Sequence, residues 1–145
     1  MSQKALGRSF NIMGIGDGKY VNMREAGGIA FSCYLAAAAG DTYTLVQAKD
    51  SAGTGAKNLV AVTDYYTCTG DGTDTWTHRT QAAAATVVTA ASAVQNHAVF
   101  EVEASQLDDG FTHVKVTSTG AGLVTPIPRD LMTQRDPANL KALSA

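Results

Sequence analysis

The chain has 145 residues, of which 45% are hydrophobic and 17% are charged, and its formal net charge is −2. This composition fits one globular domain with a core. It excludes an intrinsically disordered chain and a general nucleic-acid binder, which would need a basic face. There is no run of about 18 apolar residues, so we expect no transmembrane helix. The first residues lack the apolar segment of a secretory signal, so we expect synthesis in the cytoplasm.

The residue usage favours strands over helices. The chain contains 24 alanines and 17 threonines, and ten aspartates against only three glutamates. Threonine and valine are common in strands, whereas aspartate and glycine are common in the turns between them. The composition therefore predicts an all-β fold.

Residues 1–28 are predicted to form an extended N-terminal arm. Six of the 14 glycines lie in this segment, with isolated apolar residues between them, so the segment has no continuous face to bury. It carries a net charge of +2, against −5 for residues 29–124 and +1 for residues 125–145. This asymmetry is either chance or a sign that the ends dock on acidic surfaces of neighbouring subunits. The arm residues that we expect to contact a partner are Phe10, Ile12, Met13 and Ile15.

Residues 29–125 are predicted to form the folded body, and its first half contains four strand candidates. Turn-rich segments separate them, and the turn at 69–74 predicts a hairpin in which Trp76 is a large apolar anchor. The four candidates are residues 29–35, 42–48, 58–66 and 75–80.

The second half of the body continues the pattern. Residues 97–103 alternate, with Ala98, Phe100 and Val102 facing inward, and residues 111–117 alternate again. Two shorter candidates are residues 86–89, where the β-branched centre favours a strand over an alanine-rich helix, and 123–127. Seven or eight short strands with regularly spaced turns predict a single β-sandwich, Ig-like in the broad sense. Thr112 occupies the place where a tyrosine corner would need Tyr, so no particular Ig topology is predicted.

Residues 126–145 are predicted to form a C-terminal arm. Three prolines interrupt the segment and argue against a further regular strand. Asp136 followed by Pro137 suits the start of a short helix. The residues of this arm expected to contact a partner are Arg129, Arg135, Leu140 and Leu143.

Candidate catalytic, metal and cofactor sites mostly fail on inspection. The glycines of residues 14–18 lack the spacing of a phosphate loop, and residues 71–76 lack the ligands of a calcium loop. Asp108 and Asp109 precede a glycine, as expected of a turn. His78, His97 and His113 lie singly on separate strands, and nothing in their spacing indicates a metal site. We therefore expect no catalytic residues, no metal and no cofactor.

Two further residue sets leave alternatives open. Trp76 with Tyr65 and Tyr66 is expected to pack in the hairpin core, and a sugar-binding platform is the alternative. Cys33 and Cys68 are expected to be two buried free thiols, since a chain made in the cytoplasm is kept reduced. A disulfide formed late is the alternative.

Several passages resemble small virion structural proteins of tailed bacteriophages, particularly those of actinobacterial hosts. The passages are Asp41-Thr-Tyr-Thr-Leu-Val-Gln-Ala-Lys-Asp50, Gly53-Thr-Gly-Ala-Lys-Asn-Leu59, Thr80-Gln-Ala-Ala-Ala-Ala-Thr86, Leu107-Asp-Asp-Gly-Phe111 and Arg129-Asp-Leu-Met-Thr-Gln-Arg-Asp-Pro-Ala-Asn-Leu140. They fall within roughly residues 40–140. The similarity lies in the general residue usage of these short passages and not in a catalytic motif. Proteins of this kind are head decoration (cement) proteins or unassigned structural proteins. The resemblance implies a β-rich body on the outer capsid surface, with extended arms and no active site.

The sequence thus predicts a non-enzymatic capsid decoration protein of the virion that binds the major capsid protein and stabilises the head. Neighbouring copies of the chain are expected as further partners, a trimer being one candidate arrangement. Neither a specific nucleic acid nor a membrane is expected as a partner. The alternatives are a phage neck or tail protein and, in a different class, a carbohydrate-binding β-sandwich module.

Overall fold

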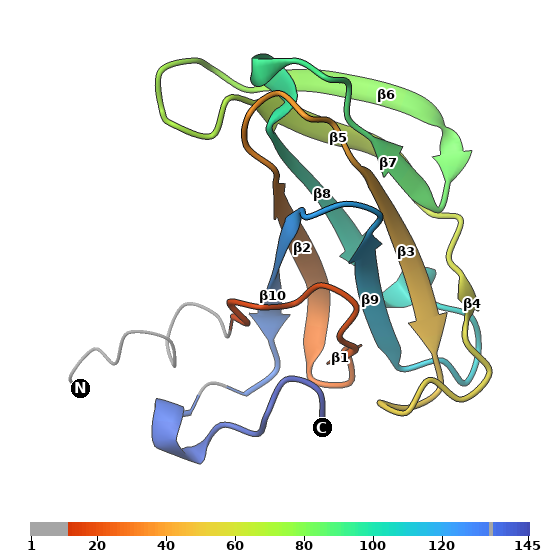
Figure 1. The fold of residues 1–145 in the computed structure, drawn as a ribbon. Coiled ribbons are helices and arrows are strands. Elements are labelled where there is room, and N and C mark those ends of the chain that lie inside the picture. Colours follow the sequence, from red (N-terminus) through yellow and green to blue (C-terminus); the bar gives the residue numbers. More distant parts are fainter. Residues whose placement is uncertain (1–11, 134) are drawn as a thin grey trace.

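The computed structural model describes residues 12–133 and 135–145, which form two antiparallel sheets (Figure 1). Sheet A has the order β1 (Val21–Asn22), β9 (His113–Ser118), β3 (Thr42–Ala48) and β4 (Lys57–Asn58), and β7 (Thr86–Val88) also pairs with β3. Sheet B has the order β10 (Leu123–Leu131), β2 (Ala26–Tyr34), β8 (His97–Glu103), β5 (Val62–Cys68) and β6 (Thr77–Ala84). The helical turns of the described residues are short 3-10 turns: η1 (Ala93–Gln95), η2 (Ala104–Gln106) and η3 (Pro137–Asn139). The prediction of an all-β fold is confirmed.

One buried core contains side chains of both sheets, so the architecture is like that of a β-sandwich. Its sheet B members include Phe31 and Phe100, whose ring centroids lie 5.7 Å apart. Its sheet A members include Leu45, Val114 and Val116, which are fully buried. The alternation predicted for residues 97–103 is confirmed, since the side chains of Ala98, Phe100 and Val102 are the buried ones. Period-two burial of this kind is what a strand with one face on a core requires.

The hairpin predicted around residues 69–74 is confirmed. Strands β5 and β6 pair from Thr67, opposite Thr77, to Val62, opposite Ala84. The register is irregular between Val62 and Asp64. The alanines at 82–84 belong to β6, and residues 86–88 form β7, as the strand interpretation predicted. The role predicted for Trp76 is wrong, because 48% of this residue is exposed. It lies just before β6, two residues before His78, so alternation places both side chains on the outer face of sheet B.

The expected end of the body at residue 125 is wrong, because β10 continues to Leu131. It pairs with β2 from Leu123, opposite Tyr34, to Leu131, opposite Ala26. Pro126 and Pro128 both lie within this paired stretch. The carbonyl of Pro126 accepts a hydrogen bond from Met13 on the side away from β2. In an antiparallel strand the N–H of a residue points to the same side as its C=O. The N–H that Pro126 lacks would therefore point away from β2, and an edge strand tolerates this proline without losing a ladder bond.

The expected N-terminal arm is wrong for the described part of residues 1–28. Strand β1 and the start of β2 both lie within it. The amides of Met13 and Gly16 donate to the carbonyls of Pro126 and Val124, at 3.3 and 2.9 Å. This segment therefore runs along the free edge of β10 and belongs to the body.

The C-terminal segment also packs on the body. The amide of Asn22 donates to the carbonyl of Leu143 at 2.7 Å, and the Leu143 side chain packs against the core. Asp136 accepts a hydrogen bond from the Ala138 amide at 3.2 Å, which is the capping contact that the sequence suggested. The helix that follows is only the 3-10 turn η3. Figure 1 shows this segment at the end of the molecule opposite the β5–β6 loop.

Candidate interaction surface

An aromatic patch lies on the outer face of sheet B. Pairing in register places Leu123, Tyr34, His97 and Cys68 side by side across β10, β2, β8 and β5. Their neighbours Cys33, Ala98 and Val124 are fully buried, so the row itself faces outward. We define the aromatic patch by its exposed apolar residues and the histidine that they surround: Tyr34, Tyr66, Trp76, His97 and Leu123.

The patch exposes large apolar side chains on a sheet of paired strands. Trp76 and Leu123 are each 48% exposed, Tyr66 is 46% exposed and Tyr34 is 37% exposed. Single exposed apolar residues are ordinary, but several that gather on one sheet face are typical of an interaction surface. Tryptophan and tyrosine are also the residues on which binding energy most often concentrates.

His97 is at the centre of the patch and is held on several sides. Its Nε2 lies 2.7 Å from the Ser32 Oγ, and its Nδ1 lies 3.8 Å from the Cys68 Sγ. The ring centroid of Trp76 lies 4.9 Å from that of His97, and Tyr34 meets the ring edge-on at 6.2 Å. Burial lowers the pKa of His97, so the ring is neutral at pH 7 and the centre of the patch carries no charge.

The Ser32–His97 contact differs in its third member from the catalytic triad of serine hydrolases. Such a triad needs a third group, commonly a carboxylate, that orients the histidine from its other nitrogen. Here the thiol of Cys68 occupies that side, and burial raises its pKa so that it stays protonated. The arrangement fixes the His97 ring in place and supports the Trp76 side chain beside it.

The β5–β6 loop brings Trp76 to the patch through internal hydrogen bonds. Asp74 accepts from the amide of Thr69 at 3.1 Å, and Asp71 accepts from the amide of Thr73 at 2.9 Å. Hydrogen bonds from Thr69 and Thr73 lower the pKa of Asp71 to about 2. Gly70 has a φ of +85°, and a Cβ there would lie 2.8 Å from the Tyr34 ring. Only glycine lets the loop approach the patch so closely.

The sugar-binding platform considered for Trp76, Tyr65 and Tyr66 is not assembled as a trio. Tyr65 packs against the core, whereas Tyr66 points outward and stacks on His78 with ring centroids 4.9 Å apart. Adjacent residues of a strand face opposite sides, so the two tyrosines are separated by the sheet. Only Trp76 and Tyr66 remain on the outer face.

A cleft of about 320 Å³ opens beside the patch, where β5 and β8 separate. The ladder between these strands covers only residues 66–68 of β5, so the sheet has a gap beyond it. The cleft is lined by Tyr66, Val99 and Phe100, and by the carboxylates of Asp64, Glu101 and Glu103.

Arg129, which the sequence predicts to contact a partner, is paired with neighbouring acids of the chain itself. It pairs with Glu101 at 3.3 Å and also with Glu103 and Asp130. Burial disfavours its charge, but these carboxylates outweigh it and raise the pKa of Arg129. Gly28 lies beneath it, and a Cβ there would lie 2.8 Å from the guanidinium carbon. The charge of Arg129 is thus satisfied within the chain.

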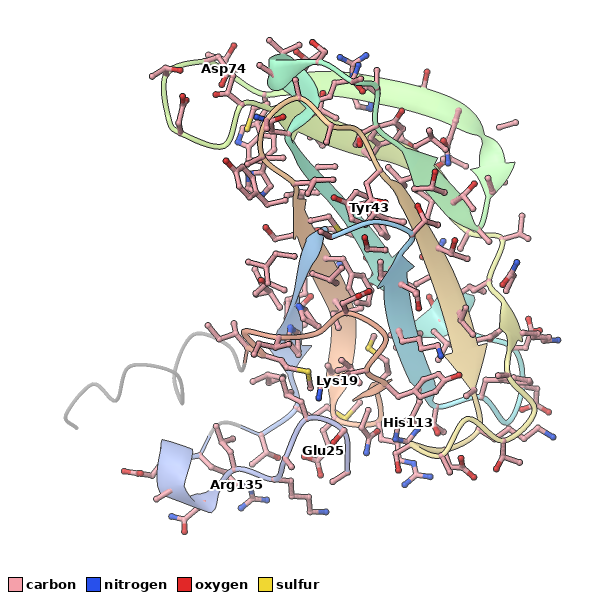
Figure 2. All side chains as sticks on the ribbon, in the orientation of Figure 1. Lys19, Glu25, Tyr43, Asp74, His113 and Arg135 are labelled. Atoms are coloured by element: carbon pink, nitrogen blue, oxygen red, sulfur yellow. The ribbon has the colours of Figure 1, made fainter. Side chains whose placement is uncertain are left out.

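The other described residues predicted to contact a partner are dispersed, and none of them belongs to the aromatic patch. Met13 and Leu143 pack against the core, and Leu140 is half-buried in a groove beside Leu131. Ile12 and Ile15 are 37% and 74% exposed, and Arg135 is exposed. Phe10 lies outside the described residues. Figure 2 places Arg135 and Glu25 at one end of the molecule and Asp74, close to the patch in sequence, at the other.

The described ranges contain neither a cluster of metal-ligating side chains nor a helix that could cross a membrane. His78 pairs with Asp64 at 2.8 Å, His97 is in the patch, and His113 is buried in sheet A, so the three rings do not converge. No three His, Cys, Asp or Glu side chains of the described residues gather closely enough to hold a metal ion. Among the same residues, no helix has the length and apolarity needed to cross a membrane. Cys33 and Cys68 are free and buried, as predicted.

Comparisons with protein-family models, with curated proteins and with solved structures found no match to this chain.

Proposed function

We propose that this chain is a non-enzymatic virion structural protein, a head decoration (cement) protein that binds the major capsid protein and stabilises the head. The observation that carries the proposal is the aromatic patch, a set of exposed apolar side chains gathered on one sheet face. The resemblance of the passages in residues 40–140 supplies the virion context. On this proposal the protein is made in the host cytoplasm and resides on the outer capsid surface.

We also propose that the body is a sandwich of the broadly Ig-like kind. The order β2–β8–β5 in one sheet and the pair β3–β9 in the other support this, because Ig domains have the strand order B–E–D in one sheet and pair C with F in the other. The connections β2 to β3 and β8 to β9 also pass between sheets, as B to C and E to F do. The departure is β10, which lies beside β2, whereas the last Ig strand lies beside F.

The two ends of the body suit two kinds of contact. The aromatic patch is assigned to the capsid shell, since exposed Trp76 and Tyr66 can be desolvated there. Exposed Ile15 and Arg135, away from the patch, remain available for neighbouring proteins. Binding only to the assembled shell stabilises that shell by mass action.

Co-sedimentation with stripped capsids tests the proposal. We expect W76A/Y66A to lose at least about tenfold in affinity, roughly 1.4 kcal/mol. The control V60A truncates a side chain that is 61% exposed and outside the patch, so it should bind as the unmodified protein does. Failure of the unmodified protein to bind capsids, or to raise the temperature at which they release DNA, would contradict the cement role. A neck or tail protein would instead be present at about six or twelve copies per particle, set by the cyclic symmetry of that part of the virion.

A second candidate function is carbohydrate binding, favoured by the exposure of Trp76 and Tyr66 on one face. Aromatic rings present flat apolar surfaces on which sugar rings can stack. Glycan binding that W76A abolishes and V60A preserves would favour this candidate over the capsid role.

A further inference from the structure

We propose that residues 136–145, which we call the strap, close over the outer face of sheet A and open in mild acid when His113 takes up a proton. This device acts in the chain by itself, whatever partner the chain binds, and so goes beyond the proposed function. Its central feature is a histidine that lies on the outer face of a sheet and is nevertheless buried.

The side chain of His113 faces outward from sheet A. Val114 and Val116 of the same strand are fully buried members of the core, so alternation turns His113 to the opposite face. Yet only 2% of His113 is exposed. A side chain on the outer face of a sheet is buried to this extent only where another part of the chain covers it.

The strap reaches this site along the free edge of β1. Its Leu143 carbonyl accepts a hydrogen bond from the Asn22 amide at 2.7 Å, and its Ala145 carbonyl accepts one from the Asn22 side chain at 2.6 Å. Asn22 and His113 are opposite each other in the β1–β9 ladder, so the end of the strap lies beside both. The C end of the chain in Figure 1 and the label of His113 in Figure 2 lie at the same end of the molecule.

One nitrogen of the His113 ring is unused. The Thr112 hydroxyl donates to the Lys49 carbonyl at 2.8 Å, so its oxygen accepts from the His113 Nδ1, also at 2.8 Å. This assigns the hydrogen of the neutral ring to Nδ1. Nε2 is buried and has no hydrogen-bond partner. A second proton therefore goes to Nε2 and brings a charge into a covered site.

Burial decides the balance of forces on the charged ring. Burial lowers the pKa of His113, the Ala145 carbonyl raises it, Arg24 in the turn between β1 and β2 lowers it, and Asp50 in the loop after β3 raises it. The net result is a pKa below the usual value. The other charged side chains of these elements are directed elsewhere: Lys49 over the Phe111 ring, Lys115 over the Tyr20 ring, and Glu25 and Lys141 along the groove of Leu140.

Protonation of His113 is thus linked to opening of the strap. Opening returns the ring to water, where the pKa of histidine is about 6.5. Because its pKa is lower in the closed state, His113 binds a proton more tightly in the open state. The closed state is therefore favoured fully above the open-state pKa, and this advantage is lost as pH falls from there through the closed-state pKa. Opening frees the edge of β1 and the side chain of Leu143.

Hydrogen exchange of the Asn22 amide, which is bonded to the strap, tests the inference on the full chain. We expect its protection factor, which is corrected for the intrinsic effect of pH on exchange, to fall at least about fivefold from about pH 7.5 to about pH 5. The Leu45 amide, bonded to the Ala85 carbonyl, should be better protected than that of Asn22 at both pH values. This difference would show that the strap opens while the body stays folded.

His113→Gln removes the titrating group and should hold the Asn22 protection factor within about twofold over the same pH range. The matched control is His78→Gln, which replaces an exposed histidine of sheet B and should keep the full response of the unmodified protein. Circular dichroism confirms that both variants are folded. An NMR titration of the His113 ring in the unmodified protein needs no variant and should give a pKa below the ordinary value.

Four results would overturn the proposal. They are an Asn22 protection factor that does not change with pH, the same change in His113→Gln as in His78→Gln, equal protection of Asn22 and Leu45, and a His113 pKa at or above the ordinary value. None of these measurements involves capsids, so failure of the strap and failure of the cement role are distinguishable.

Discussion

Asp41 and Thr119 are joined by two hydrogen bonds to one carboxylate oxygen. The Asp41 Oδ1 accepts from the Thr119 hydroxyl at 2.9 Å and from the Thr119 amide at 3.1 Å. The same oxygen accepts from the amides of Thr42 and Gly120, and Oδ2 accepts from the Ser118 hydroxyl. Asp41, a residue that is only 6% exposed, thus ties the start of β3 to the turn that follows β9.

Asp41→Ala is expected to lower the free energy of unfolding by about 3 kcal/mol, because five donors, among them the buried Ser118 hydroxyl, lose a charged acceptor. Chemical unfolding in urea at pH 7 measures this loss. The matched control is Asp109→Ala, which removes an exposed carboxylate in a turn and should change stability by less than about 0.5 kcal/mol. Equal effects of the two substitutions would contradict the role given to Asp41.

The Asp41 contribution should depend on pH. Burial opposes ionisation of this carboxyl, but its hydrogen bonds to Ser118, Thr119 and the backbone outweigh burial and lower its pKa. A pKa that is lower in the folded state means that the stabilisation is present above the unfolded-state pKa and is lost as pH falls through the folded-state value. The stability difference between the unmodified protein and Asp41→Ala should therefore shrink when the urea titration is repeated in acid. A difference that is constant down to about pH 2 would contradict this.

Gly122→Ala is expected to destabilise the fold by about 1–3 kcal/mol through overpacking. A Cβ at Gly122 would lie 2.5 Å from the Asp41 Oδ2, 2.8 Å from the Tyr43 ring and 2.9 Å from the Ser118 Oγ. Gly14→Ala is the matched control, because a Cβ there meets nothing within 4 Å. Thermal melting should give a lower midpoint for Gly122→Ala only. A normal midpoint would mean that the turn after β9 adapts freely.

The two thiols should differ in reactivity toward an aromatic disulfide reagent. Cys33 is fully buried and burial raises its pKa, so its reaction should require unfolding. Cys68 is 6% exposed at the aromatic patch and should react first, at a rate that local opening limits. Mass spectrometry of the labelled protein identifies the modified residue. Faster labelling of Cys33 would contradict the placement of the two side chains.

The strands of the body could be predicted because their side chains alternate. The pattern around Phe100 and Val102, and that around Val114 and Val116, follows from burying one face of a strand. The aromatic patch could not be predicted, since Tyr34, His97 and Trp76 come together only through the pairing of separate strands. The closest sequence signal was the presence of Tyr66 and Trp76 on the two sides of a turn, and it indicated core packing or a sugar platform.

The ends of the chain were misjudged for a different reason. Glycine and proline indicate extended arms in the sequence, although Gly16 and Pro126 each have a specific place in the body. Gly16 allows close approach to Pro126, and Pro126 lies where an edge strand needs no donor. Whether a proline interrupts a strand or lies at its free edge depends on the neighbouring strand, which a single sequence does not specify.

The final prediction separates the last strand from the segment that follows it. Removal of residues 126–145 deletes most of β10, including Pro126 and Pro128, which are buried against the body. It also uncovers the backbone of β2, so we expect this truncation not to fold. Removal of residues 136–145 keeps all of β10 and loses mainly the contacts of Leu143, so we expect a folded protein less stable by about 1–3 kcal/mol. Circular dichroism and urea unfolding of the two proteins provide the comparison. A folded, stable protein ending at residue 125 would show that β10 is dispensable, as the initial interpretation of these residues as an arm required.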